Sequence, residues 1–71
     1  MDRIRVIHDQ RGKTLTIWFG DSSLESFCSE SADEVVIMKD DHGRAIGFEV
    51  LHYDPSNPPD SVFLETFPSR T

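Results

Sequence analysis

The chain has 71 residues, of which 37% are apolar and 28% charged, and its formal net charge is −6. This length allows one small domain. The acidic charge argues against nucleic-acid binding, because phosphate contacts need clustered Lys and Arg. No apolar run approaches the roughly 20 residues that span a bilayer, and no basic segment followed by an apolar run indicates a signal peptide. We therefore expect a cytoplasmic globular domain that binds neither nucleic acid nor membranes.

The small size predicts a partner chain. Domains below about 70–80 residues often need a disulfide, a metal or a partner for stability. The single cysteine, Cys28, excludes an intramolecular disulfide. The three histidines, His8, His42 and His52, lack the spacing of a zinc site. We therefore expect no metal and no other cofactor, and we predict a homodimer.

The first elements along the chain form a predicted β-hairpin. Residues 3–8 alternate polar and apolar side chains, which is the period of a half-buried strand. Residues 14–19 are β-branched, aromatic or aliphatic, which also favours a strand. Between them, Asp9 and Gly12 indicate a turn, because Asp bonds the turn backbone and Gly tolerates positive φ.

The polar segment 20–33 is less decisive. Residues 24–28 alternate as in a short strand, whereas a single helical turn capped by Asp21 or Ser22 is the competing interpretation. The many serines and few helix formers favour the strand.

A second hairpin follows. Residues 34–39 are apolar at both odd and even positions, which is typical of a strand covered on both faces. Residues 40–43, Asp-Asp-His-Gly, indicate a turn, and residues 44–52 alternate again as a strand.

The last segment begins with prolines. Three prolines between residues 54 and 60 prevent a central strand there, since proline lacks the backbone donor. Residues 62–67 are apolar enough to dock, either as a strand or as one helical turn. We therefore predict a hairpin-repeat domain over 1–53, with a proline-rich linker and an apolar C-terminal tail over 54–71 that packs on it as part of the same domain.

The two hairpins repeat one pattern. Residues 4–19 align with residues 35–50, so that Asp9 and Gly12 fall on Asp40 and Gly43. The predicted fold is mainly β, or α+β, with a small antiparallel sheet of five or six strands. The alternation defines a first face, expected to form the core: Ile4, Val6, Leu15, Ile17, Phe19, Val35, Ile37, Ile46, Phe48 and Val50.

The opposite side of the predicted sheet, the second face, is too apolar for simple exposure to solvent. Its expected cover is either the tail, through Val62, Phe63, Leu64 and Phe67, or another chain. The second alternative predicts an interface made of Trp18, Val36, Met38, Glu49 and Leu51.

Glu49 is the most unusual acidic residue, because it lies within an apolar strand. Burial would raise its pKa and suit catalysis, but no acid or base partner lies nearby in the sequence. Cross-strand pairing with Arg3, Arg5 or Arg44 is the favoured interpretation. We predict no catalytic residue.

The negative charge is concentrated in residues 14–43, whose net charge equals that of the whole chain. Glu30, Asp33 and Glu34 form a predicted acidic lobe, which suits a basic partner protein. Ordinary solubilising charge is the alternative explanation.

Residues 9–19, 34–40 and 43–51 resemble a family of small bacterial and cyanobacterial proteins catalogued as domain of unknown function 2283. The resemblance covers about residues 5–53 and leaves out the tail. It implies a small β-rich domain, carries no established activity and transfers no functional residue. It also implies an antitoxin-like or regulatory role, because some members are encoded near toxin-like proteins.

The expected function is thus a non-enzymatic protein-interaction or regulatory module. The alternative is a small ligand-binding or enzymatic domain with a cleft at a dimer interface, using Glu49 or a histidine.

Overall fold

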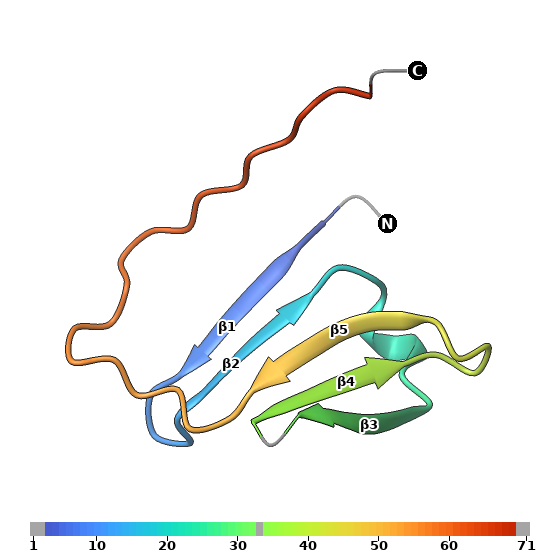
Figure 1. Ribbon diagram of the computed structural model, residues 1–71, viewed down its shortest axis with the longest axis horizontal. Helices are drawn as coiled ribbons and strands as arrows, with labels where there is room; N and C mark the ends of the chain where they lie inside the picture. Colours follow the sequence, from blue (N-terminus) through green and yellow to red (C-terminus); the bar gives the residue numbers. More distant parts are fainter. Residues whose placement is uncertain (1–2, 33, 70–71) are drawn as a thin grey trace.

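Five antiparallel strands form one open sheet in the computed structural model, which describes residues 3–32 and 34–69, with the backbone alone at 30–32. The sheet order is β1-β2-β5-β4-β3 (Figure 1). The mainly-β prediction is confirmed. The elements are β1 (Arg5–Asp9), β2 (Thr14–Trp18), the 3-10 turn η1 (Ser22–Leu24), β3 (Phe27–Ala32), β4 (Val35–Lys39) and β5 (Ala45–Val50).

The two repeated segments form two hairpins, β1–β2 and β4–β5, that meet at the centre of the sheet. β2 and β5 are antiparallel neighbours, with Ile17 opposite Phe48 and Leu15 opposite Val50. Ile17 and Phe48 are also equivalent positions of the sequence repeat. A pseudo-twofold axis therefore passes between these two residues and relates one hairpin to the other.

The repeat breaks down at the turns. In the second hairpin, the Gly43 N–H donates to the Asp40 carbonyl at 3.0 Å, and Gly43 has a φ of 77°. In the first hairpin the left-handed residue is Lys13, with a φ of 58°, one position later in the repeat. A register shift accommodates this difference in β5, because the consecutive residues Met38 and Lys39 pair with Gly47 and Ala45 and leave Ile46 unpaired.

The segment between the hairpins contains both of the alternatives that its sequence left open. The Asp21 carboxylate accepts a 3.0 Å hydrogen bond from the Ser23 N–H and caps η1. The strand begins only at Phe27, not at residue 24. The predicted strand start is therefore corrected, because the Asp21 cap stabilises a helical turn first.

The first face is present, but it is not a buried core. The ten predicted residues occupy positions of one parity on the paired strands or next to their ends. Only Ile46 among them is buried, with 7% of its surface exposed, whereas Ile4, Val6 and Phe19 are 48%, 38% and 43% exposed. The sheet is a single layer over the part of the chain that the structure describes, so this face has no opposing layer.

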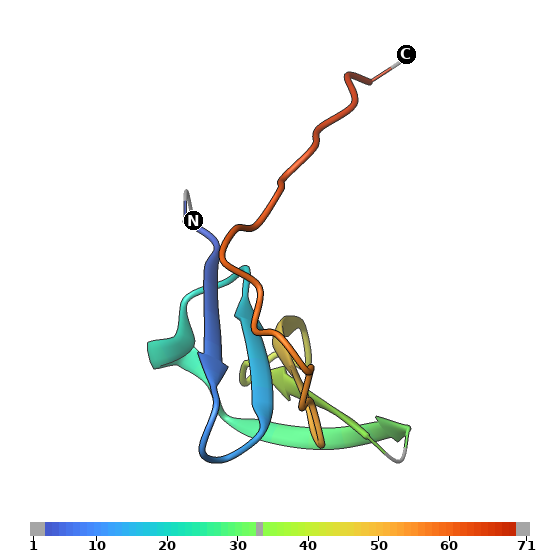
Figure 2. The same ribbon diagram turned by 90° about the vertical axis from the view of Figure 1, so that its left-hand side faces the viewer.

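The C-terminal tail, residues 54–69, adds no strand and no helical turn. It passes beside β1 and projects beyond the sheet in both ribbon views (Figures 1 and 2). Its large apolar side chains are not packed as expected: Val62, Phe63, Leu64 and Phe67 are 67%, 88%, 73% and 83% exposed. The tail also lies away from the second face, since its residues line hollows with the first face. Its membership of the same domain stays a prediction.

Candidate functional site

The predicted interface residues do lie together on the second face. Trp18 and Met38 flank Gly47 from the two neighbouring strands, and Val36 lies opposite Glu49. The alternation of the strands places all four side chains on one side of the sheet.

These side chains largely cover one another within a single chain. A Cβ atom on Gly47 would lie 2.7 Å from Cε3 of Trp18, so the indole ring packs directly on this glycine. Met38 is 5% exposed, and Trp18, Val36 and Leu51 are half-buried. The second face therefore carries a cluster of buried and half-buried side chains, and its role as an interface stays a prediction.

Glu49 has a different partner from the one expected. Its carboxylate accepts a 3.3 Å hydrogen bond from the Thr16 hydroxyl on β2. Arg44 pairs within its own turn instead, and neither Arg3 nor Arg5 forms an ion pair with Glu49 in the described chain. The pairing prediction is corrected, because Arg44 pairs with Asp40 inside its own turn and β2 separates the strand of Arg5 from β5.

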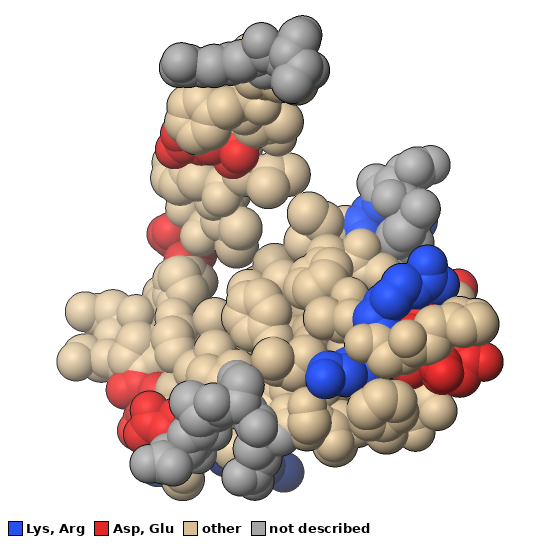
Figure 3. Space-filling model, turned by 45° about the vertical axis from the view of Figure 1, so that its right-hand side comes forward, with Lys and Arg blue, Asp and Glu red and all other residues tan. Residues whose placement is uncertain are grey.

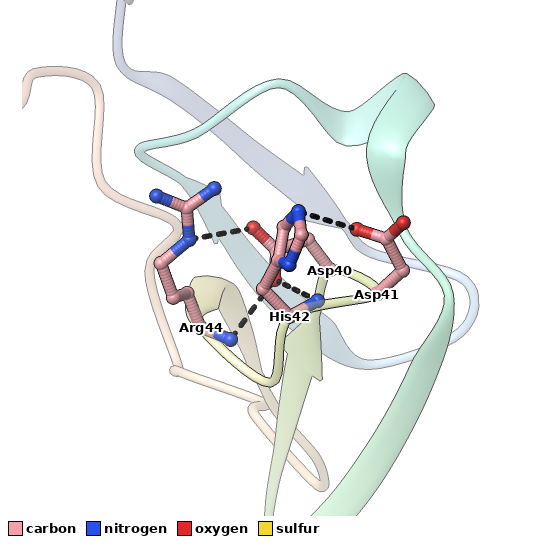
Figure 4. Close-up of polar contacts among 4 residues, drawn as sticks. All are labelled: Asp40, Asp41, His42 and Arg44. Carbon is pink, nitrogen blue, oxygen red and sulfur yellow. Dashed lines mark hydrogen bonds and ion pairs between the residues drawn. The ribbon is translucent and has the colours of Figure 1, made fainter.

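That acceptor is Asp40, which sequence reasoning treated only as a turn residue. It is 3% exposed, and its Oδ1 accepts from the backbone N–H groups of His42 and Arg44, both at 2.9 Å (Figure 4). Its Oδ2 accepts from Nε of Arg44 at 3.1 Å. A buried carboxylate with three donors organises the turn, and the Asp-x-x-Gly-base pattern is the signal that identifies it.

The hydrogen bonds of this turn predict a pH dependence of stability. The Arg44 N–H that donates to the carboxylate lowers the pKa of Asp40 below its ordinary value of 3.8. A carboxyl group whose pKa is lower in the folded state stabilises the protein above its unfolded pKa, and this stabilisation is lost as pH falls through the folded pKa. We therefore expect the urea midpoint to fall below pH 3.8 and Asp40→Asn to weaken that dependence. Asp41→Asn is the control, and an identical pH profile for Asp40→Asn and the wild type would contradict the assignment.

A second polar cluster joins the start of the tail to the first hairpin. The rings of His8 and Tyr53 meet edge to face at 5.1 Å, and the Tyr53 N–H donates to the Lys13 carbonyl at 2.8 Å. Nζ of Lys13 lies 3.6 Å from the Asp54 carboxylate. Together with Asp60, His8 and Tyr53 line a hollow of about 510 Å³. Within the described residues, no three His, Cys, Asp or Glu side chains gather as metal ligands.

The exposed apolar surface lies on the first face beside the tail. A second hollow, of about 460 Å³, opens between the tail and the sheet and is lined by Ile4, Val6, Ile17, Phe19 and Val62–Leu64. The space-filling view shows a broad surface free of charged residues beside the base of the tail, with charged residues of both signs toward its edges (Figure 3). Sequence reasoning assigned these first-face residues to the core and so missed them as a candidate contact surface.

The acidic lobe is described only in part. Glu34 is exposed, and its carbonyl accepts a 2.7 Å hydrogen bond from the Leu51 N–H. Asp33 and the side chain of Glu30 lie outside the described residues. The lobe as a site therefore stays a prediction.

The family model described as Protein of unknown function (DUF2283) matches residues 5–55. The chain belongs to this family. The DUF2283 match spans all five strands and ends before the exposed part of the tail, which agrees with the limits of the resemblance. No curated protein and no solved structure matches the chain. Over the described residues, no helix is long and apolar enough to cross a bilayer.

Proposed function

We propose that this DUF2283 protein is a non-enzymatic protein-interaction module whose contact surface is the first face of the sheet. The observation that carries the proposal is the exposure of Ile4, Val6 and Phe19 at 38–48% on one continuous face. Contiguous apolar patches of this kind on a small protein are typical of interaction surfaces.

The composition of this face fits an interface better than a catalytic site. Aromatic side chains are enriched in the centres of interfaces and charged ones are depleted. Phe19 and Phe48 approach each other on this face, with ring centroids 6.4 Å apart. The catalytic alternative rests on Glu49, whose partner is a neutral threonine hydroxyl. A neutral hydroxyl is not the acid or base partner that general acid–base catalysis uses.

A regulatory, antitoxin-like role is the finer form of this proposal. The net charge of −6 favours a basic partner protein through electrostatic steering. The acidic lobe of Glu30, Asp33 and Glu34 would attract that partner. Replacing all three by lysine should then abolish binding of a lysine-rich peptide and leave the first face unaffected.

Amide NMR spectra of the full chain test which face makes contact. We expect chemical shifts of Val6, Ile17 and Phe19 to change when the protein is diluted from millimolar to micromolar concentration. Shifts of Trp18 and Val36 should stay constant, since they belong to the second face. Concentration-dependent shifts confined to Trp18 and Val36 would overturn the assignment of the first face. Shifts that depend on neither dilution nor added lysine-rich peptide would overturn the interaction module.

Ligand binding is the second candidate, because the hollow at His8 and Tyr53, of about 510 Å³, has the size of a small-molecule pocket. Its open, mainly apolar walls suit a flat aromatic compound. If this function holds, a screen of aromatic fragments should shift the amide signals of His8 and Tyr53, and His8→Ala should abolish the shift. A screen that moves neither signal would contradict it.

A further inference from the structure

The tail carries apolar side chains on both of its sides. In an extended segment, alternate side chains point in opposite directions. Val62 and Leu64 therefore share one side, and Phe63 and Phe67 share the other. The phenylalanine side is the more exposed, at 88% and 83% compared with 67% and 73%. Val62, Phe63 and Leu64 all border the hollow beside the tail's own sheet, yet they remain 67–88% exposed, so this sheet does not cover them.

The face of the sheet beside the tail is also left uncovered. The hollow of about 460 Å³ between them has Ile4, Val6 and Phe19 on the sheet side and Val62–Leu64 on the tail side. Its walls are apolar and stand apart. The chain's own tail therefore leaves this part of the first face open to an apolar segment of another molecule.

Charge also favours the tail as a partner of the first hairpin, at the turn that holds Arg11 and Lys13. Arg3 and Arg5 alternate with Ile4 and Val6 and therefore lie on the second face. Residues 3–13 hold four basic side chains and one acidic side chain, whereas residues 54–69 hold three acidic side chains and no Lys or Arg. One such attraction is already visible within the chain, where Nζ of Lys13 lies 3.6 Å from Asp54. Asp60 and Glu65 carry the same negative charge further along the tail. Complementary charges of this kind select a partner surface and its orientation.

The area available fits a dimer. Burying one phenylalanine removes about 150–250 Å² from solvent. Two phenylalanines from each of two tails, together with the sheet surface that they cover, give roughly 1,200–2,000 Å², the range of a specific interface. The single chain also needs such burial, since Met38 and Ile46 are the large apolar side chains buried among its described residues.

We propose that two copies of this chain form a dimer by exchanging C-terminal tails. Phe63 and Phe67 of each tail cover the apolar first face of the other copy, and the acidic tail lies near the basic turn at Arg11 and Lys13 of that copy. This inference rests on the proposed function, since it uses the first face as the contact surface, and it names the second copy as the bound protein.

Light scattering after size exclusion measures the mass of the full chain and of two variants. The wild type should have twice its monomer mass of 8.1 kDa. The tail variant Phe63→Ser/Phe67→Ser and the face variant Val6→Ser/Phe19→Ser should each weaken dimerisation by about a hundredfold, as expected when central interface anchors are removed. Leu24→Ser is the matched control, because Leu24 is 56% exposed on η1, outside both surfaces, and this variant should stay dimeric.

Mixing the two variants provides the decisive measurement. The face variant contributes an intact tail and the tail variant an intact face, so the mixture should recover one of two docking contacts and form a heterodimer. A mixture that stays monomeric would overturn tail exchange, and so would a monomeric wild type. Circular dichroism checks that both variants are folded, since each should retain the strand signal of the wild type.

The outcomes separate this inference from the function on which it rests. If the tail variant still dimerises while the face variant does not, tail exchange is overturned and the first face remains the contact surface. If the face variant dimerises like the wild type, the proposed contact surface fails as well. If each tail docks on its own sheet instead, the protein should be a monomer, and the first-face amide signals of the tail variant should differ from those of the wild type. That result would overturn tail exchange alone.

Discussion

Replacing Met38 by alanine should lower the free energy of unfolding by about 2–5 kcal/mol, the usual cost of truncating a buried large side chain. Met38 is 5% exposed and lies between Gly47 on β5 and Cys28 on β3. The single-layer sheet offers few side chains that could move into the resulting cavity. Since a domain of this size has only about 3–5 kcal/mol of stability from its core, we expect a substantial unfolded population at 25 °C.

Urea unfolding followed by circular dichroism measures this effect. Met38→Leu is the matched control, because a volume-conserving apolar exchange costs less than about 1.5 kcal/mol. A midpoint for Met38→Ala that equals that of Met38→Leu would show that the second face contributes little to stability.

The second large effect is expected at Gly47. A Cβ atom there would lie 2.7 Å from Cε3 of Trp18 and 2.8 Å from the Ile17 carbonyl oxygen. The indole ring has room to move, but the carbonyl belongs to the central strand β2 and does not. Gly47→Ala should therefore cost about 1–3 kcal/mol through overpacking, and it should also change the fluorescence emission of Trp18.

Ala45→Val tests the same strand without the close contact. Ala45 is exposed on β5, and surface substitutions usually change stability by less than about 0.5 kcal/mol. If Gly47→Ala had the stability and the Trp18 emission of the wild type, the packing of the indole ring on Gly47 would be wrong.

Much of the fold was predictable because two local signals coincide. Alternation identified the strands, and the turns at Asp9–Gly12 and Asp40–Gly43 fixed where they reverse. The sequence repeat then indicated that both hairpins share one register. Ile17 and Phe48, which are equivalent in the repeat, lie opposite each other where β2 pairs with β5.

Burial was not predictable in the same way. Alternation tells which side chains share a face, but whether that face is covered depends on a second layer. Ile46 is buried whereas Val6 is 38% exposed, although both belong to the first face. The tail was expected to dock because it is apolar, yet Phe63 remains 88% exposed. Apolar character therefore identified which segments carry large apolar side chains, but not which of these side chains are covered.

The polar contacts were missed for a local reason. A sequence pattern indicates which side chains share a face of the sheet, but not which strands are neighbours or which acceptor lies nearest to an arginine. Asp40 accepts from Arg44 at 3.1 Å inside the same turn, and this leaves the Thr16 hydroxyl as the partner of Glu49. Within a tight turn, the spacing of two residues in the sequence fixes the distance between their side chains, whereas the position of a residue along a strand does not fix its cross-strand partner.

The meeting of β2 with β5 also has a consequence for how the molecule folds. Each of these strands belongs to a hairpin closed by a short turn, and hairpins form in about 1–10 μs. β2 and β5 are distant in the chain, with η1, β3 and β4 between them. Their pairing must therefore close a long loop, a slow and entropically costly step. We expect two preformed halves to collide along the Ile17–Phe48 seam, so that this seam sets the folding rate.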